Sequence, residues 1–101
     1  MKDTVERLVE AHCADFFRRD AAIRSGELSS RTLMELRYLN AKMLDAAVEL
    51  VGYGDAELFI SEIGSGCGYA HSDLTDISEV TYKRKKQELK RALAKKIHLI
   101  D

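Results

Sequence analysis

The densest run of chemically active side chains lies near the end of the chain. Between residues 83 and 96 there are eight lysines and arginines and a single acid, Glu88. On a helix most of these basic residues would lie opposite an apolar stripe formed by Tyr82, Leu89 and Leu93, and Lys85 and Lys96 would lie near the stripe. Like charges at helical spacing weaken a helix by roughly a few tenths of a kcal/mol per pair, so an anionic partner would offset their repulsion. The phosphates of a nucleic acid are the commonest partner of that kind.

The residue types on this basic face suit a nucleic acid. Arginine and glutamine can bond to base edges, lysine and tyrosine can hold phosphates, and a helix fits the major groove. We therefore predict a nucleic-acid-binding surface formed by Thr81, Tyr82, Lys83, Arg84, Gln87, Lys90, Arg91 and Lys95. The alternative is a solvated helix, or one that meets an acidic surface of another protein or of a second subunit.

Charge is divided unevenly along the chain. Residues 1–80 carry 8 basic and 15 acidic side chains, a sum of −7, whereas residues 81–101 carry 8 basic and 2 acidic ones, a sum of +6. Such a division indicates either a polyanionic partner or a basic end that packs near the acidic remainder of the same chain.

A family resemblance covers about a fifth of the chain, ISEVTYKRKKQELKRALAKKI at residues 77–97. This segment resembles the recognition-helix segment of small phage transcriptional regulators with a sigma-factor-like helix-turn-helix. The resemblance implies that Ile77 packs in the turn and that Ser78 caps the helix. It also implies that DNA is faced or flanked by Thr81, Tyr82, Arg84 and Lys85. The preceding residues depart from the pattern, because GSGCGYAHSDLTD has three glycines where a compact first helix is expected.

The other chemically active residues do not have the spacing of a known site. GSGCG at 64–68 follows a predicted helix, whereas a dinucleotide fingerprint is G-x-G-x-x-G between a strand and a helix. Cys67 and His71, like His12, Cys13 and Asp73, lack the ligand spacing of a structural zinc site. We therefore predict no metal, no cofactor, no small-molecule substrate and no enzymatic activity. The glycine-rich segment 64–76 is predicted to be a hinge or a sharp turn.

The elements that position these residues are predicted to be helices, since no segment alternates as a strand does. Apolar residues spaced for one helical face predict helices over 4–24, 32–51, 55–63 and 78–97. Thr32 with Glu35 matches a capping box at the start of the second helix, and Ser78 is a good cap for the last. The predicted fold is a single all-α domain, residues 1–101, with three longer helices and one short one. The first two helices are predicted to be antiparallel.

Two groups of polar residues bear on the packing of the first two helices. Asn40 lies within the apolar stripe of 32–51, which predicts a buried amide that fixes register or is satisfied in the core. Acids are interspersed among the arginines around the turn between these helices, which predicts a solvated surface of ion pairs. Those arginines are Arg18, Arg19, Arg24, Arg31 and Arg37.

Composition excludes several other classes of protein. Acids interrupt the apolar residues near the N-terminus, which is not typical of a targeting peptide. No apolar run approaches the roughly 18 residues of a membrane span, and two cysteines form no disulfide framework. We predict a small cytoplasmic DNA-binding protein, a helix-turn-helix-like transcriptional regulator of phage or mobile-element type. The apolar faces of the first two helices predict a homodimer. The alternative is a homodimeric protein-interaction or structural module with no nucleic-acid role.

Overall fold

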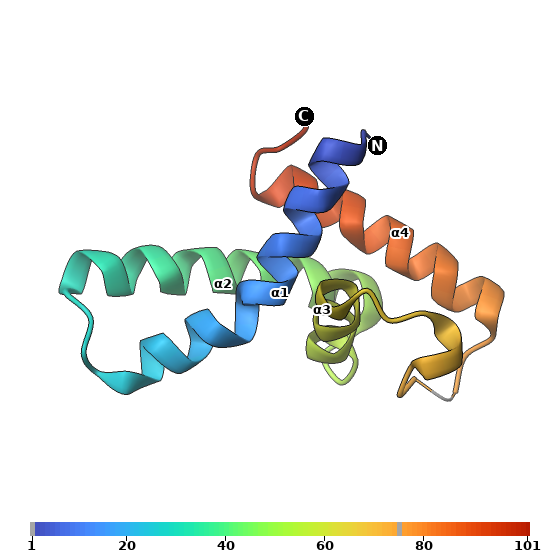
Figure 1. The fold of residues 1–101 in the computed structure, drawn as a ribbon, viewed down its shortest axis with the longest axis horizontal. Coiled ribbons are helices and arrows are strands. Elements are labelled where there is room, and N and C mark those ends of the chain that lie inside the picture. Colours follow the sequence, from blue (N-terminus) through green and yellow to red (C-terminus); the bar gives the residue numbers. More distant parts are fainter. Residues whose placement is uncertain (1, 75) are drawn as a thin grey trace.

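The computed structural model describes residues 2–74 and 76–101, and these residues form helices joined by short connections. Figure 1 shows the elements in chain order: α1 (Asp3–Ser25), α2 (Ser30–Val51), α3 (Ala56–Ser65), the short 3₁₀ turn η1 (Tyr69–His71) and α4 (Glu79–Lys96). The described residues contain no strand, so the predicted all-α class is confirmed. The antiparallel orientation of the first two helices stays a prediction.

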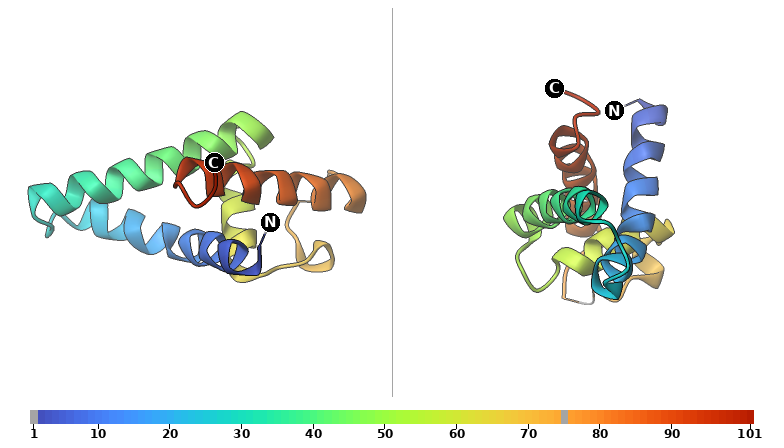
Figure 2. Two further views of the ribbon diagram at one scale, coloured as in Figure 1. Left: turned by 90° about the horizontal axis from the view of Figure 1, so that it is seen from above. Right: turned by 90° about the vertical axis from the view of Figure 1, so that its left-hand side faces the viewer.

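The molecule is elongated, with extents of 43 × 28 × 21 Å. The turn between α1 and α2 lies at one end, and both helices extend from it toward the region where α3 and α4 pack (Figures 1 and 2). We call residues 18–38, which include this turn, the α1–α2 arm. The start of α1 and the C-terminal end of the chain lie near each other, away from the tip of the arm (Figure 1). None of the described helices combines the length and apolar character that crossing a bilayer needs.

Serine hydroxyls begin both α2 and α4. Ser78 caps α4 as predicted, accepting a hydrogen bond from the Thr81 N–H over 3.2 Å. At α2 the predicted capping box of Thr32 and Glu35 is wrong. The helix begins earlier, because Ser29 accepts from the Thr32 N–H over 3.4 Å. Both caps share the pattern Ser-x-x-Thr, in which the two hydroxyls also bond to each other over 3.0 Å.

Gly64 is a packing residue rather than part of the connection that its surrounding glycines predicted. It lies inside α3, where that helix crosses α1. A Cβ atom added to Gly64 would stand 2.5 Å from the backbone nitrogen of Ala14, so only glycine allows this approach. The connection to α4 begins at Gly66, which ends α3 in the left-handed conformation with φ of 71°.

A buried polar group joins α1 to α2 within the arm. Arg19 is only 3% exposed, so its predicted place on a solvated surface is wrong. Its Nε donates to Asn40 Oδ1 over 2.6 Å and its terminal nitrogens donate to Asp15 and to the His12 carbonyl. Asn40 is buried, as its place in the apolar stripe predicted, and donates in turn to the Phe16 carbonyl. Burial lowers the pKa of the Arg19 guanidinium, and Asp15 opposes that shift.

The other arginines of the arm behave as the sequence predicted. Each is exposed, and three of them pair with an acid three or four residues away on the same helix. These pairs are Arg18 with Asp15, Arg24 with Asp20, and Arg31 with Glu35.

Candidate nucleic-acid interface

α4 lies with its apolar stripe against the rest of the molecule. Leu89 and Leu93 are fully buried, and the ring of Tyr82 stacks on that of Phe59 from α3 with centroids 5.7 Å apart. This burial leaves the opposite side of α4 in solvent along its length. We call this side the outer face of α4, formed by exposed residues only: Lys83, Arg84, Gln87, Glu88, Arg91 and Lys95.

The cations of the outer face differ in their partners. Lys83 pairs with Glu79 one turn earlier, over 3.1 Å. Within residues 2–74 and 76–101, no acid lies within 4.0 Å of the charged groups of Arg84, Arg91 or Lys95. Glu88 is exposed on the same face, so the outer face carries a net positive charge rather than a purely basic surface.

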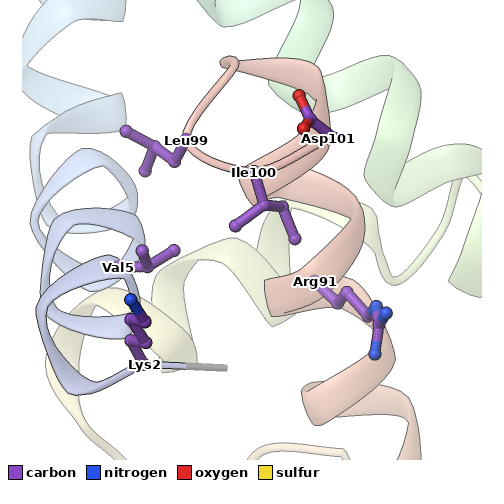
Figure 3. Close-up of a pocket in the computed structure, with 6 residues that line it drawn as sticks. All are labelled: Lys2, Val5, Arg91, Leu99, Ile100 and Asp101. Carbon is purple, nitrogen blue, oxygen red and sulfur yellow. The ribbon is translucent and has the colours of Figure 1, made fainter.

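Arg91 borders a hollow of about 460 Å³ between the start of α1 and the end of the chain. Lys2, Val5, Leu99 and Asp101 are among its other lining residues. Figure 3 shows the Arg91 side chain pointing away from Lys2 and Val5. The guanidinium is thus available to the outer face rather than enclosed in the hollow.

Two of the predicted contact residues, Tyr82 and Lys90, lie in the interior. Tyr82 is 1% exposed and donates its hydroxyl hydrogen to Glu62 over 2.8 Å. Lys90 is 8% exposed, and its Nζ lies 3.0 Å from a carboxylate oxygen of Glu6 and 3.7 Å from one of Glu10. These two side chains hold α4 against α3 and α1. A nucleic-acid surface on this helix would therefore have to be formed by the remaining predicted residues.

Thr81 also has a structural contact. It is half-buried, and its hydroxyl is hydrogen-bonded to that of Ser78 within the cap of α4. Lys96, outside the predicted set, is exposed beside Lys95 and adds to the positive charge at the end of the helix.

Glu62 is the residue that connects α4 to the loop before it, and the sequence interpretation missed it. This carboxylate is 6% exposed on α3. It accepts hydrogen bonds from the Ser72 hydroxyl over 2.6 Å, from the Asp73 N–H over 3.0 Å and from Tyr82. Burial, with the hydrogen bond to Glu62, raises the pKa of Tyr82 to about 12. The only signal in the sequence is that Glu62 lies three residues after the core residue Phe59, on the inward side of α3.

Lys86 makes a second connection between α4 and the loop. Its Nζ donates to the Cys67 carbonyl over 2.5 Å and lies 5.6 Å from the centre of the Tyr82 ring. Burial lowers the pKa of this lysine. The glycines of this segment predicted a hinge or a turn. In the structure the described residues of the loop are bonded to both α3 and α4, which sets the position of the basic helix.

The candidate metal ligands of the sequence are dispersed. Cys13 is buried in the core, where burial raises the pKa of its thiol to about 12, and Cys67 lies in the loop. Among residues 2–74 and 76–101, no three side chains of the types that bind metals come together in a way that could hold an ion.

Comparisons with protein-family models, with curated proteins and with solved structures find no match for this chain. The resemblance of residues 77–97 to phage regulators therefore stays a prediction.

Proposed function

We propose that this protein binds DNA through the outer face of α4 and acts as a small cytoplasmic regulator of transcription, of phage or mobile-element type. The observation that carries the proposal is an internal contrast in charge pairing. Three of the four exposed arginines in the arm, Arg18, Arg24 and Arg31, pair with an acid on the same helix, and Arg37 does not. Arg84, Arg91 and Lys95 lie on one exposed face and have no acid within 4.0 Å among the described residues, although Glu88 is on the same helix.

The spacing of these cations suits a phosphate backbone. Arg84, Arg91 and Lys95 recur at seven and four residues, so they lie on one side of the helix over roughly 16 Å of its length. A DNA duplex carries one negative charge about every 1.7 Å of its axis, so such a row meets several phosphates at once. Gln87, on the same face, is of a type that bonds to adenine edges. In this proposal the cations supply affinity and Gln87 contributes to sequence preference.

The likeness of residues 77–97 to a recognition helix supports a regulatory role. The proposal also includes the helix-turn-helix arrangement that this likeness implies. η1 is a single turn of three residues where a full first helix would stand in that motif. The loop bonds of Glu62 and Lys86 would then replace the packing of a first helix in holding α4.

Binding to a labelled duplex of mixed sequence, followed by fluorescence anisotropy at several salt concentrations, tests the proposal. If three phosphates are contacted, log K should fall with log salt with a slope of about −3. The variant Arg84→Gln/Arg91→Gln/Lys95→Gln should lose this binding and keep its helical circular dichroism. Lys90 is left unchanged, because it holds α4 against α1.

The matched control is Arg7→Gln/Arg18→Gln/Arg24→Gln, which removes the same charge from exposed positions of α1. Binding that survives in the control and disappears in the α4 variant supports the proposal. Equal losses in both would indicate a response to net charge alone. No binding at about 50 mM salt would overturn the proposal, since phosphate contacts are strongest at low salt. The alternative, a module whose basic helix meets an acidic protein surface, would then take its place.

A further inference from the structure

The outward side of α2 carries large apolar side chains that no other described element covers. Met34 is 71% exposed and Tyr38 is 66% exposed, one helical turn apart. Ala41 continues the line, and together these residues border a shallow groove. Soluble proteins seldom expose neighbouring large apolar residues without a partner for them. These residues belong to α2, whose first half forms part of the α1–α2 arm (Figure 2).

The charges at the two ends of the same side of α2 differ in sign. Arg31 lies before the apolar residues, and its side chain is 91% exposed. Asp45 and Glu49 lie after them and are exposed as well. Glu35 and Lys42 lie between Arg31 and these acids, so the outermost charges of this face are basic at its start and acidic at its end. A helix that pairs with this face must carry the same order in reverse, and α2 itself does so when it is turned end to end.

We propose that α2 is the interface with a second copy of this chain, in which the two α2 helices pack antiparallel about a two-fold axis at Tyr38. Arg31 is seven residues before Tyr38 and Asp45 is seven after it, so each is two turns from the axis on the same side. Arg31 of one copy then meets Asp45 of the other, and the two-fold axis forms this ion pair twice.

The inner positions of this register match as well. Met34 is four residues before Tyr38, and Lys42 is four after it. The aliphatic stem of Lys42 then covers Met34 of the other copy. Within one copy, the Lys42 ammonium already lies 4.8 Å from the centre of the Tyr38 ring. The apolar contacts thus fall at the centre and the ion pairs at the rim, as in protein interfaces generally.

The size of this surface sets the strength of the association. A standard stable interface buries about 800 Å² on each partner. One face of a single helix offers less, so the dimer is weak, with a Kd in roughly the micromolar range. The inference does not depend on nucleic-acid binding by α4, and either one can fail without the other.

Sedimentation equilibrium of the full chain over a range of micromolar concentrations measures the association. The wild type should show a reversible dimer. Tyr38→Glu should give a monomer, because it places two carboxylates at the axis. Tyr53→Glu is the matched control, since Tyr53 is 82% exposed and lies outside the stripe, and it should leave the dimer unchanged.

A charge exchange tests the register. Arg31→Asp should raise the Kd of the dimer at least tenfold, because the new carboxylate would face Asp45 of the other copy. The double variant Arg31→Asp/Asp45→Arg should restore it, which a general effect on folding would not do. Restoration should disappear at high salt, where exposed ion pairs are screened.

Oxidative cross-linking tests independently whether the two α2 helices meet at Tyr38. In a Cys67→Ser background, Tyr38→Cys should form a disulfide-linked dimer, because facing backbones of packed helices come within disulfide reach. Tyr53→Cys should not. A monomeric wild type at high micromolar concentration, or a dimer that persists in Tyr38→Glu, would overturn the proposal.

Discussion

Charged side chains have opposite environments in the arm and in the region where α1, α3 and α4 cross. In the arm, Arg24 pairs with Asp20 one turn away, and the Arg24 side chain is 78% exposed. At the crossing, Lys90 and Glu62 are buried, and their partners come from other helices. Arg19 is the exception within the arm, since it is buried and bridges to α2.

The difference separates what charges do for folding from what they leave available for binding. An exposed pair one turn apart on a helix contributes roughly 0.3–0.5 kcal/mol and is screened by salt. A buried polar group that loses its partner costs about 1–3 kcal/mol, because water does not replace the lost bond. Stability should therefore respond to changes at the crossing and at Arg19, and hardly at all to charge changes at the exposed residues of the arm or on the outer face of α4.

The largest effect is expected at the crossing of α1 and α3. Gly64→Ala should lower the free energy of unfolding by about 3 kcal/mol, the upper end of the usual range for overpacking. The added Cβ would meet the backbone of Ala14, which cannot rotate away as a side chain can. Urea denaturation measures the change. Gly68→Ala is the control, because a Cβ there meets nothing within 4 Å. Equal urea midpoints for Gly64→Ala and Gly68→Ala would show that α1 and α3 can move apart at little cost in free energy.

The next effect depends on pH. The pKa of Tyr82 is raised from its ordinary 10.0 to about 12, so the unfolded chain gives up this proton more readily than the native one. The raised pKa therefore contributes to the free energy of unfolding. This contribution is fully present below pH 10 and is lost as pH rises through about 12. By pH 12 the loss is about 2 kcal/mol. At neutral pH, Tyr82→Phe should be less stable than the wild type by about 1–2 kcal/mol, through the lost bond to Glu62.

The difference between wild type and Tyr82→Phe should shrink as the solution becomes alkaline. Chemical denaturation at a series of pH values from neutral to alkaline measures it. The raised pKa of Cys13 destabilises both proteins at high pH and cancels in the comparison. Tyr53→Phe should follow the wild type throughout, since that ring is exposed. A difference that stays constant with pH would mean that Tyr82 does not titrate with folding.

The smallest effect compares two basic residues that differ in burial. Lys90→Gln should cost about 1 kcal/mol of stability, because it removes the partner of Glu6 between α1 and α4. Arg24→Gln, which removes the same charge from an exposed pair, should change stability by less than about 0.5 kcal/mol. Thermal denaturation at low and moderate salt measures both losses of stability. A larger loss for Arg24→Gln than for Lys90→Gln would contradict the distinction between exposed pairs in the arm and buried groups at the crossing.

Helix existence and most helix ends were predictable from local pattern. The cap at Ser78 follows from a hydroxyl before an apolar periodic run, and the end of α1 at Gly26 from a glycine after one. The start of α2 was not predictable in this way. Ser29 and Thr32 are both good capping residues, and only the path of the chain selects between them. Asn40 was recognisable as buried, since it interrupts an otherwise apolar stripe.

The sequence by itself determined an all-α chain with a basic, amphipathic last helix, because periodicity and capping are properties of neighbouring residues. Only the tertiary structure decided which polar residues are internal. Lys90 and Lys95 belong to one basic run, and the acids of α1 draw the first inward while the second stays in solvent. Arg19 and Glu62 are buried where the fold brings them a partner from another helix, Asn40 for Arg19 and Tyr82 for Glu62. The physical reason is that desolvation of a charge is offset only by partners brought together through the fold, and sequence spacing does not report those distances.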